Sequence, residues 1–413
     1  MNALARMAWG ILCGGTLVAQ GQNAELANPS FEEGAQAPTG WSLSQGKGEW
    51  AKTGGVDNGA CAMVEGDGKG DNAWLSSPVA FVPGRAYRLS FSARADAAGG
   101  GTAVSGPSFA NVDIGVPGKT WSSFEHIFAT PSSPDGVKAP VRLGQWQMHG
   151  QLFFDNVRLA AVEPVYATSE GVVLGTGEKL TGNAYAFEAL LGGESRNHSR
   201  PLLESTAHFN SDRWCFGSGS TVTYRHALNA HRLLSGSVEV SCGYYVAGSL
   251  TVEASNDGKN WQRIGALTRT GSATFALPSA LFPADAVSVR LQGAGSSTDL
   301  QVNGYSYRGT VDGTPVSFEG RTHYIEETAR DSRVKVRVVG LGEALPGKEN
   351  VATLQVQNLT PAALTLQARV RFSQAGLPVR TQAVTATLPA GGKDTTVRVP
   401  YPIPGTGTWK MTV

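Results

Sequence analysis

Apolar and polar residues alternate along most of this chain. In YRLSFSAR (residues 87–94), Tyr, Leu, Phe and Ala fall on one face, and Arg and Ser fall on the other. Residues 249–255, 352–358 and 365–372 repeat the pattern. A period of two predicts β-strands with one buried face. The best helical window is short, residues 184–191, so the sequence predicts an all-β protein.

Turn-forming residues divide these strands into three segments. Glu163-Pro164 follows the strand-like FFDNVRLA, and Gly309–Gly313 follows YSYRG. We therefore expect tandem β-sandwiches over residues 24–162, 165–309 and 315–413, each close to the size of one sandwich. The third segment has alternating strands with turns at PGKEN and AGGKD, which predicts an immunoglobulin-like sandwich, although one without a Cys pair. It shows no clustered His, Asp or Glu, so we expect it to serve as a spacer.

Residues 1–21 have the features of a secretory signal peptide. Arg6 supplies the positive charge, an apolar stretch runs from Met7 to Ala19, and small residues precede a cut at Gln22. The stretch is too short and too rich in glycine for a membrane span. The sequence thus predicts a secreted or cell-surface protein, with a buried first strand or helix as the alternative.

The other end of the chain leaves two readings open. Trp409, Met411 and Val413 alternate with polar residues up to the last position. This strand either closes the third sandwich or belongs to a longer protein. We favour a longer protein, in which a catalytic domain downstream would make this chain an accessory region.

Charge and cysteine content limit the classes of binding partner and the disulfides that the chain can form. The formal net charge is +1, so no overall field attracts nucleic acid. Once the signal is removed, Cys61, Cys215 and Cys242 remain. If the protein is exported, we prefer a Cys215–Cys242 disulfide because both residues lie in one predicted sandwich. Three unpaired buried thiols are the alternative.

The first segment carries an ordered set of motifs. They are Asn28, Phe31, Glu32, Gly40-Trp41, Pro83-Gly84, Tyr87, Thr120-Trp121 and a final strand with Phe154, Asp155, Asn156, Val157 and Leu159. Over residues 24–162 this order resembles the galactose-binding-like jelly-roll carbohydrate-binding modules attached to polysaccharide-degrading enzymes. The resemblance implies a glycan or polysaccharide ligand. In that family pattern Trp41 and Trp121 are core positions.

Glu32 and Asp155 are candidate metal ligands. Asp155 shares parity with Val157 and Leu159, so we expect it to face the core, where an unpaired carboxylate is costly. Two carboxylates with backbone carbonyls suit Ca²⁺. The resemblance implies a structural calcium at this place. The alternative is that both carboxylates only accept backbone N–H groups.

Sugar binding requires an aromatic platform and hydrogen-bonding side chains. In LGQWQMHG (residues 143–150) the apolar phase switches at Gly144, which predicts a β-bulge that re-aims its neighbours. The candidates are Trp146 as platform with Gln145 and Gln147 beside it. Trp74 is a second platform candidate. The alternative for Trp146 is a packed core position.

The second segment shows a weaker resemblance over residues 220–310. VEASNDGKNWQRIG has the Asn-Asp-Gly turn of a β-hairpin and resembles the corresponding segment of discoidin-like domains, another galactose-binding-like sandwich. The aromatic residues that could line a second site are Trp214, Tyr244, Tyr245 and Tyr305. The sequence does not separate them from core residues.

No catalytic motif stands out. HExxH, G-x-S-x-G and P-loop patterns are absent, and the His residues are scattered. The leading hypothesis is an exported, multi-modular carbohydrate-binding protein that targets an enzyme or a cell to glycans. One alternative is a structural or adhesive surface protein with sandwich spacers. Another is a glycoside hydrolase whose catalytic region carries no recognisable motif.

Overall fold

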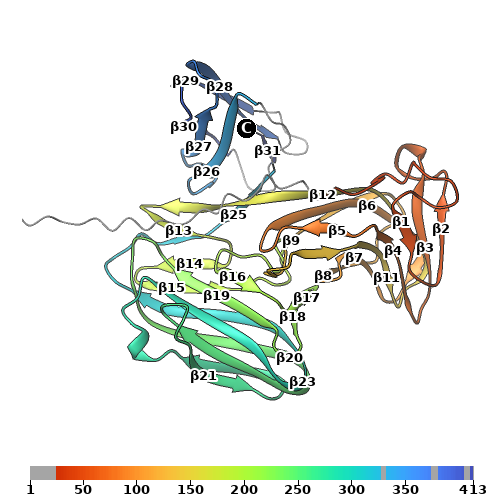
Figure 1. The fold of residues 1–413 in the computed structure, drawn as a ribbon, viewed down its shortest axis with the longest axis horizontal. Coiled ribbons are helices and arrows are strands. Elements are labelled where there is room, and N and C mark those ends of the chain that lie inside the picture. Colours follow the sequence, from red (N-terminus) through yellow and green to blue (C-terminus); the bar gives the residue numbers. More distant parts are fainter. Residues whose placement is uncertain (1–24, 327–331, 374–379, 404–409, 413) are drawn as a thin grey trace, which may run out of the picture.

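The computed structural model describes residues 25–326, 332–373, 380–403 and 410–412. These residues form β-strands, loops and two 3₁₀ turns (Val56–Asn58 and Ser279–Leu281), and no α-helix occurs among them. The protein is all-β and consists of tandem β-sandwiches, as predicted (Figure 1). The predicted signal peptide lies outside the described residues. No helix in the described part of the chain is long and apolar enough to cross a membrane.

The first sandwich packs two sheets around one apolar core. One sheet has the order β2-β3-β12-β6-β9, and the facing strands follow β1-β4-β11-β7-β8. The strands are β1 (Trp41–Leu43), β2 (Lys47–Ala51), β3 (Cys61–Asp67), β4 (Asp71–Ser76), β5 (Val79–Phe81), β6 (Ala86–Gly99), β7 (Thr102–Pro107), β8 (Ala110–Gly115), β9 (Ser122–Ala129), β10 (Val137–Ala139), β11 (Val141–Trp146) and β12 (His149–Ser169).

The second sandwich is built around two long bent strands, β20 and β23, which pair with each other along most of their length. The strands are β13 (Val172–Leu174), β14 (Glu178–Thr181), β15 (Ala184–Glu188), β16 (Leu202–Ser205), β17 (His208–Asn210), β18 (Arg213–Phe216), β19 (Thr221–Ala227), β20 (Leu233–Ser255), β21 (Gln262–Leu267), β22 (Gly271–Ala276) and β23 (Ala286–Val311). Its core runs from Val172 to Val311.

A connecting segment leads to the third sandwich, which has two three-stranded sheets, β26-β27-β30 and β29-β28-β31. The strands are β24 (Phe318–Glu319), β25 (Thr322–Ile325), β26 (Val334–Gly340), β27 (Asn350–Asn358), β28 (Leu364–Ser373), β29 (Arg380–Leu388), β30 (Asp394–Tyr401) and β31 (Lys410–Thr412). The connecting strands pair with earlier ones, β24 with β14 and β25 with β12.

Side-chain alternation explains which face each strand buries. In β6, Tyr87, Leu89 and Phe91 are at most 2% exposed and belong to the first core, whereas Arg88 and Arg94 lie on the other face. The same rule corrects the helix expected over residues 184–191. Residues 184–188 form β15 instead, because pairing with β14 and β23 places alternate aromatic side chains in the second core.

The first two sandwiches share a sheet. Strand β8 pairs in parallel with β17, Ala110 opposite Phe209 and Asn111 opposite Asn210, so one sheet continues from β1 to β24. Strand β12 also runs without interruption through Glu163-Pro164, where the sequence suggests a boundary. In Figure 1 this strand separates the second sandwich, below it, from the third, above it.

Candidate functional site

Trp146 and Gln147 lie at the end of β11, at one edge of the first sandwich. Trp146 is 52% exposed and stands opposite Asp71 of β4 and Thr102 of β7. Gln147 is exposed and has a positive φ of 53° in the turn that follows. The structure therefore leaves both side chains accessible.

Gln145 and Trp74 are not accessible, contrary to the sequence-based prediction. Gln145 is 3% exposed, donates to Asn72 Oδ1 (2.7 Å) and accepts from Met148 N (2.7 Å). Trp74 is 4% exposed, and its indole N–H donates to Met63 O at 3.0 Å. Both residues stabilise the interior instead of contacting a ligand.

The predicted bulge at Gly144 is also wrong. β11 pairs with β4 and with β7 without a register shift from Arg142 to Trp146. Gln145 therefore keeps the core-facing phase of Leu143, and its polar groups are satisfied inside. Glycine occupies position 144 because a Cβ there would lie 2.2 Å from Asn72 O.

A different aromatic group lies on the solvent-facing side of sheet β2-β3-β12-β6-β9. The Arg94 guanidinium carbon is 3.8 Å from the Phe153 ring centroid and 5.2 Å from that of Trp121. Phe153 of β12 stands directly opposite Arg94 of β6, and Trp121 immediately precedes the next strand, β9. All three side chains are half-buried. We call Trp121, Arg94 and Phe153 the first platform.

Polar side chains flank the first platform on the same face. Gln151 of β12 stands opposite Asp96 of β6 and Glu65 of β3, and Glu65 lies 3.6 Å from Lys47 in an exposed ion pair. Flat rings next to carboxylate, amide and ammonium groups can contact both the C–H face and the hydroxyl rim of a sugar.

Part of this platform could have been predicted from strand alternation, but the family pattern led to a different assignment. The pattern assigned Trp121 to the core, but its ring is half-buried beside Arg94. In FFDN two successive Phe residues must face opposite sides of a strand. Since Phe154 is fully buried in the core, Phe153 had to face outward.

Glu32 and Asp155 both contact the short loop Gly55–Ala60. Asp155 Oδ2 accepts from Val56 N at 2.7 Å, and Glu32 Oε1 accepts from Ala60 N at 2.9 Å. Burial raises the pKa of the Asp155 carboxyl, the N–H groups of Val56 and Asn156 oppose this, and the carboxylate of Glu32 adds to the rise. The backbone N–H role, which the sequence left as the alternative, is present.

The expectation that Asp155 faces the apolar core is wrong. A register shift between Asp155 and Arg158, where Asn156 has φ 49°, reverses the phase of β12. Phe154 therefore points into the core, and Asp155 is buried on the other side, at the Gly55–Ala60 loop. Among the described residues, no three His, Cys, Asp or Glu side chains lie close enough to hold a metal ion. Backbone carbonyls of the loop would have to complete a calcium site.

The predicted Cys215–Cys242 disulfide is wrong, because both thiols are free. Cys215 stands opposite Gln301 of β23, and Cys242 stands opposite Val302. Neighbouring residues of β23 point to opposite faces, so the two thiols lie on opposite sides of the sheet and cannot be bridged.

The structure separates the aromatic residues of the second sandwich. Trp214 and Tyr305 are at most 2% exposed and belong to the core, and half-buried Tyr245 packs against it. Tyr244 is 46% exposed on the outer face of β20. Of these four residues, only Tyr244 is well exposed to solvent.

A buried polar network crosses the second core. Glu178 is 2% exposed and pairs through both oxygens with Arg200, and Tyr185 donates to Glu178 Oε1 at 2.7 Å. His226 lies 3.4 Å from the Tyr185 hydroxyl and 2.9 Å from that of Tyr305. Burial, and secondarily Arg200, lowers the pKa of His226 well below its ordinary value. The members of this network are hydrogen-bonded to each other, so the network stabilises the fold.

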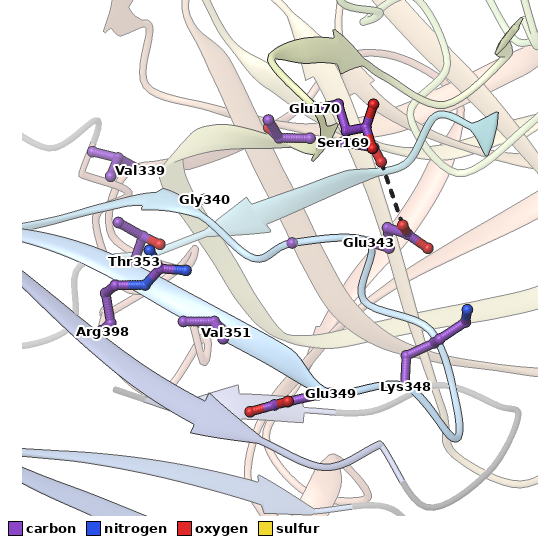
Figure 2. Close-up of a pocket in the computed structure, with 12 residues that line it drawn as sticks. Ser169, Glu170, Val339, Gly340, Glu343, Lys348, Glu349, Val351, Thr353 and Arg398 are labelled. Carbon is purple, nitrogen blue, oxygen red and sulfur yellow. Dashed lines mark hydrogen bonds between the residues drawn. The ribbon is translucent and has the colours of Figure 1, made fainter. Parts of the chain in front are cut away.

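A cavity of about 490 Å³ lies between the end of β12 and the third sandwich (Figure 2). It is lined by Thr168, Ser169, Glu170, Val339, Gly340, Gly342, Glu343, Lys348, Glu349, Val351, Thr353 and Arg398. Ser169 and Glu343 point toward each other across it, 3.4 Å apart. Since none of these lining residues is aromatic, the cavity offers no stacking surface for a sugar.

Comparisons with known proteins define no family for this chain. No protein-family model matches the sequence, and no curated protein matches it. Among solved structures, the chain is similar to the N-terminal CBM22-1-CBM22-2 tandem domain of Xyn10C from Paenibacillus barcinonensis. The match has 11% identity and a TM-score of 0.29, and it covers 70% of this chain and 98% of that one.

A second match is to a calcium-binding mutant of beta-glucuronidase 2 from Bacteroides uniformis. It has 10% identity and a TM-score of 0.15, and it covers 58% of this chain and 28% of that one. Likenesses at this level establish neither a family nor a function.

Proposed function

We propose that the first sandwich is a carbohydrate-binding module whose ligand lies on the first platform. The observation that carries this proposal is the arrangement of Trp121, Arg94 and Phe153 on an outward sheet face, flanked by Gln151 and Asp96. Aromatic side chains with nearby planar polar groups are the chemistry that sugar recognition requires. The ordered family motifs over residues 24–162 support the same reading.

The test is binding of the full chain to a panel of soluble and insoluble polysaccharides. Trp121→Ala and Phe153→Ala should each weaken binding about tenfold, which corresponds to about 1.4 kcal/mol. Trp146→Ala is the matched control, because Trp146 is a more exposed tryptophan at another edge of the same sandwich. It should change binding less than about twofold.

Other outcomes would revise or reject the proposal. Loss of binding in Trp146→Ala alone would move the site to the end of β11 and leave the function unchanged. Absence of binding to every polysaccharide, in a folded protein, would favour the structural or adhesive alternative.

Calcium at Glu32 and Asp155 belongs to the same proposal. The two carboxylates converge on one loop, and a hard cation with oxygen ligands would offset their repulsion. We expect Ca²⁺ at 100 times its dissociation constant to stabilise the fold by about 2.7 kcal/mol. Asp155→Asn should abolish this gain in thermal unfolding, whereas Asp96→Asn, on the same sheet face, should keep it.

Export and an accessory role complete the proposed function. In this reading the protein is secreted or displayed on the cell surface and targets a polysaccharide-degrading enzyme, or the cell, to glycans. Both statements rest on residues 1–21 and on a downstream catalytic domain, which remain predictions. Reading the gene beyond Val413 and sequencing the N-terminus of the mature protein test them directly.

A further inference from the structure

We infer that the second sandwich carries another glycan-binding surface, centred on Trp261, so that the chain binds one glycan surface at two points. This inference rests on the proposed function of the first sandwich. Trp261 lies at the end of the β20–β21 hairpin loop, just before β21. The Arg290 guanidinium carbon lies 4.2 Å from its ring centroid.

The ring of Trp261 packs against Arg290, which is itself held by an ion pair. Arg290 of β23 stands opposite Glu253 of β20 and donates to Glu253 Oε2 from Nε (2.8 Å) and Nη2 (2.7 Å). The ion pair is partly buried, with side chains 27% and 18% exposed. Because Arg290 is fixed by this pair, the indole rests on a planar support and is pre-organised for stacking.

Polar side chains on neighbouring strands flank this point. Thr223 of β19 stands opposite Arg290 but is fully buried, and its Oγ1 donates at 3.3 Å to Oε1 of Glu204, which is exposed on β16. On the other side, exposed Arg263 of β21 stands opposite Glu253. The flanking side chains therefore offer carboxylates and guanidinium groups to the hydroxyls of a chain lying across the strands.

The chemistry matches that of the first platform. Each surface has an Arg in contact with a Trp ring on the outer face of a β-sheet, with carboxylates in neighbouring positions. The occupant we assign is accordingly the same class of ligand, an extended polysaccharide. The buried aromatic residues of the second core, such as Trp214, cannot provide this contact.

The two surfaces are fixed relative to each other. β8 and β17 join the sandwiches in one sheet, and the Asn197 side chain accepts from Ala129 N (2.8 Å) and donates to Ala129 O (3.0 Å). When one polymer spans both sites, their linkage raises its apparent affinity by about 10²–10⁴ without further contacts. A short oligosaccharide that occupies one site at a time gains nothing from the linkage.

The test compares wild type, Trp261→Ala, Trp121→Ala and the double variant. Calorimetric titration with a short oligosaccharide of the bound polysaccharide should give two sites in wild type and one in each single variant. Each single variant should lose about 10²-fold in apparent affinity for the polymer. Tyr244→Ala, an exposed aromatic on another face of the same sandwich, is the matched control and should change neither value.

Each remaining outcome separates this inference from the proposed function. Unchanged stoichiometry in Trp261→Ala would overturn the inference and leave the first platform intact. Loss of all binding in Trp261→Ala, with none lost in Trp121→Ala, would support the second surface and reject the first. If Trp261→Ala does not fold, Trp261→Leu retains apolar volume without a flat ring, and retained two-site binding there would overturn the inference.

Discussion

The two junctions between sandwiches differ in what crosses them. Backbone hydrogen bonds cross the first junction, between β8 and β17 and from Ile127 N to Glu194 O at 3.1 Å. At the third sandwich, a cavity of about 490 Å³ lies beside the end of β12, and the two hydrogen bonds that border it are long, Thr168 N to Gly342 O at 3.5 Å and Ser169 to Glu343 at 3.4 Å.

This difference has a consequence for how the protein unfolds and binds. Opening the first junction breaks buried backbone hydrogen bonds, whereas opening the cavity beside the third sandwich breaks long polar contacts at little cost in free energy. The first two sandwiches should therefore act as one body. The third adds Val165 of β12 to its own core but should keep its own unfolding transition.

The largest expected effect comes from Glu178 in the second core. Burial alone would lower the pKa of Arg200, but its hydrogen bonds to Glu178 outweigh this and raise the pKa above its ordinary value. Glu178→Ala leaves the buried Arg200 without its counter-ion, although the hydrogen bond from Arg200 to Ala227 O remains, and should cost about 3–5 kcal/mol of unfolding free energy. Denaturant unfolding, followed separately in the first and second sandwiches, should show both unfolding in one transition. Lys179→Ala, which removes an exposed ion pair with Glu319, should cost less than about 1 kcal/mol.

The second largest effect is expected at low pH, which should weaken the first junction. His126 is 3% exposed, and burial, with Arg196 nearby, lowers its pKa to about 3. Because the folded pKa lies below the unfolded value of 6.5, its contribution to stability is full above pH 6.5 and declines as pH falls toward 3. Each pH unit costs about 1.4 kcal/mol, so from pH 6.5 to 5 the loss is about 2 kcal/mol. His126→Leu should lose about 2 kcal/mol less over this interval, and exposed His208→Leu should behave as wild type.

Asn197 tests the junction without changing charge. Asn197→Ala leaves Ala129 N and O without their partner and should cost about 1–3 kcal/mol. Differential scanning calorimetry should then show the transition of the first two sandwiches shifted or split. Exposed Asn303→Ala is the matched control. An unshifted transition in the Asn197 variant would mean that the other hydrogen bonds across the junction, β8–β17 pairing among them, are sufficient to join the sandwiches.

The smallest effect is expected at the cavity. Ser169→Ala removes the long contact to Glu343 and should change unfolding free energy by less than about 0.5 kcal/mol. The transition of the third sandwich should not move. A loss above about 1 kcal/mol would show that this junction is as tightly coupled as the first.

The sequence by itself determined the class of fold and the buried face of most strands. Alternation is a local property, and Tyr87, Leu89 and Phe91 are buried as their spacing required. It also indicated Glu32 and Asp155 as a pair, and both carboxylates contact the Gly55–Ala60 loop.

Only the tertiary structure decided which aromatic residues are accessible. The sequence offered Trp74 as a platform candidate, and the family resemblance implied a core position for Trp121. The structure buries Trp74 and leaves Trp121 half-buried, since burial depends on which strand covers a face and not on residue type. A bulge after Asp155 and the absence of one at Gly144 depend on neighbouring strands far apart in sequence. The β8–β17 pair joins residues about a hundred positions apart, so no local sequence pattern could predict that two sandwiches form one sheet.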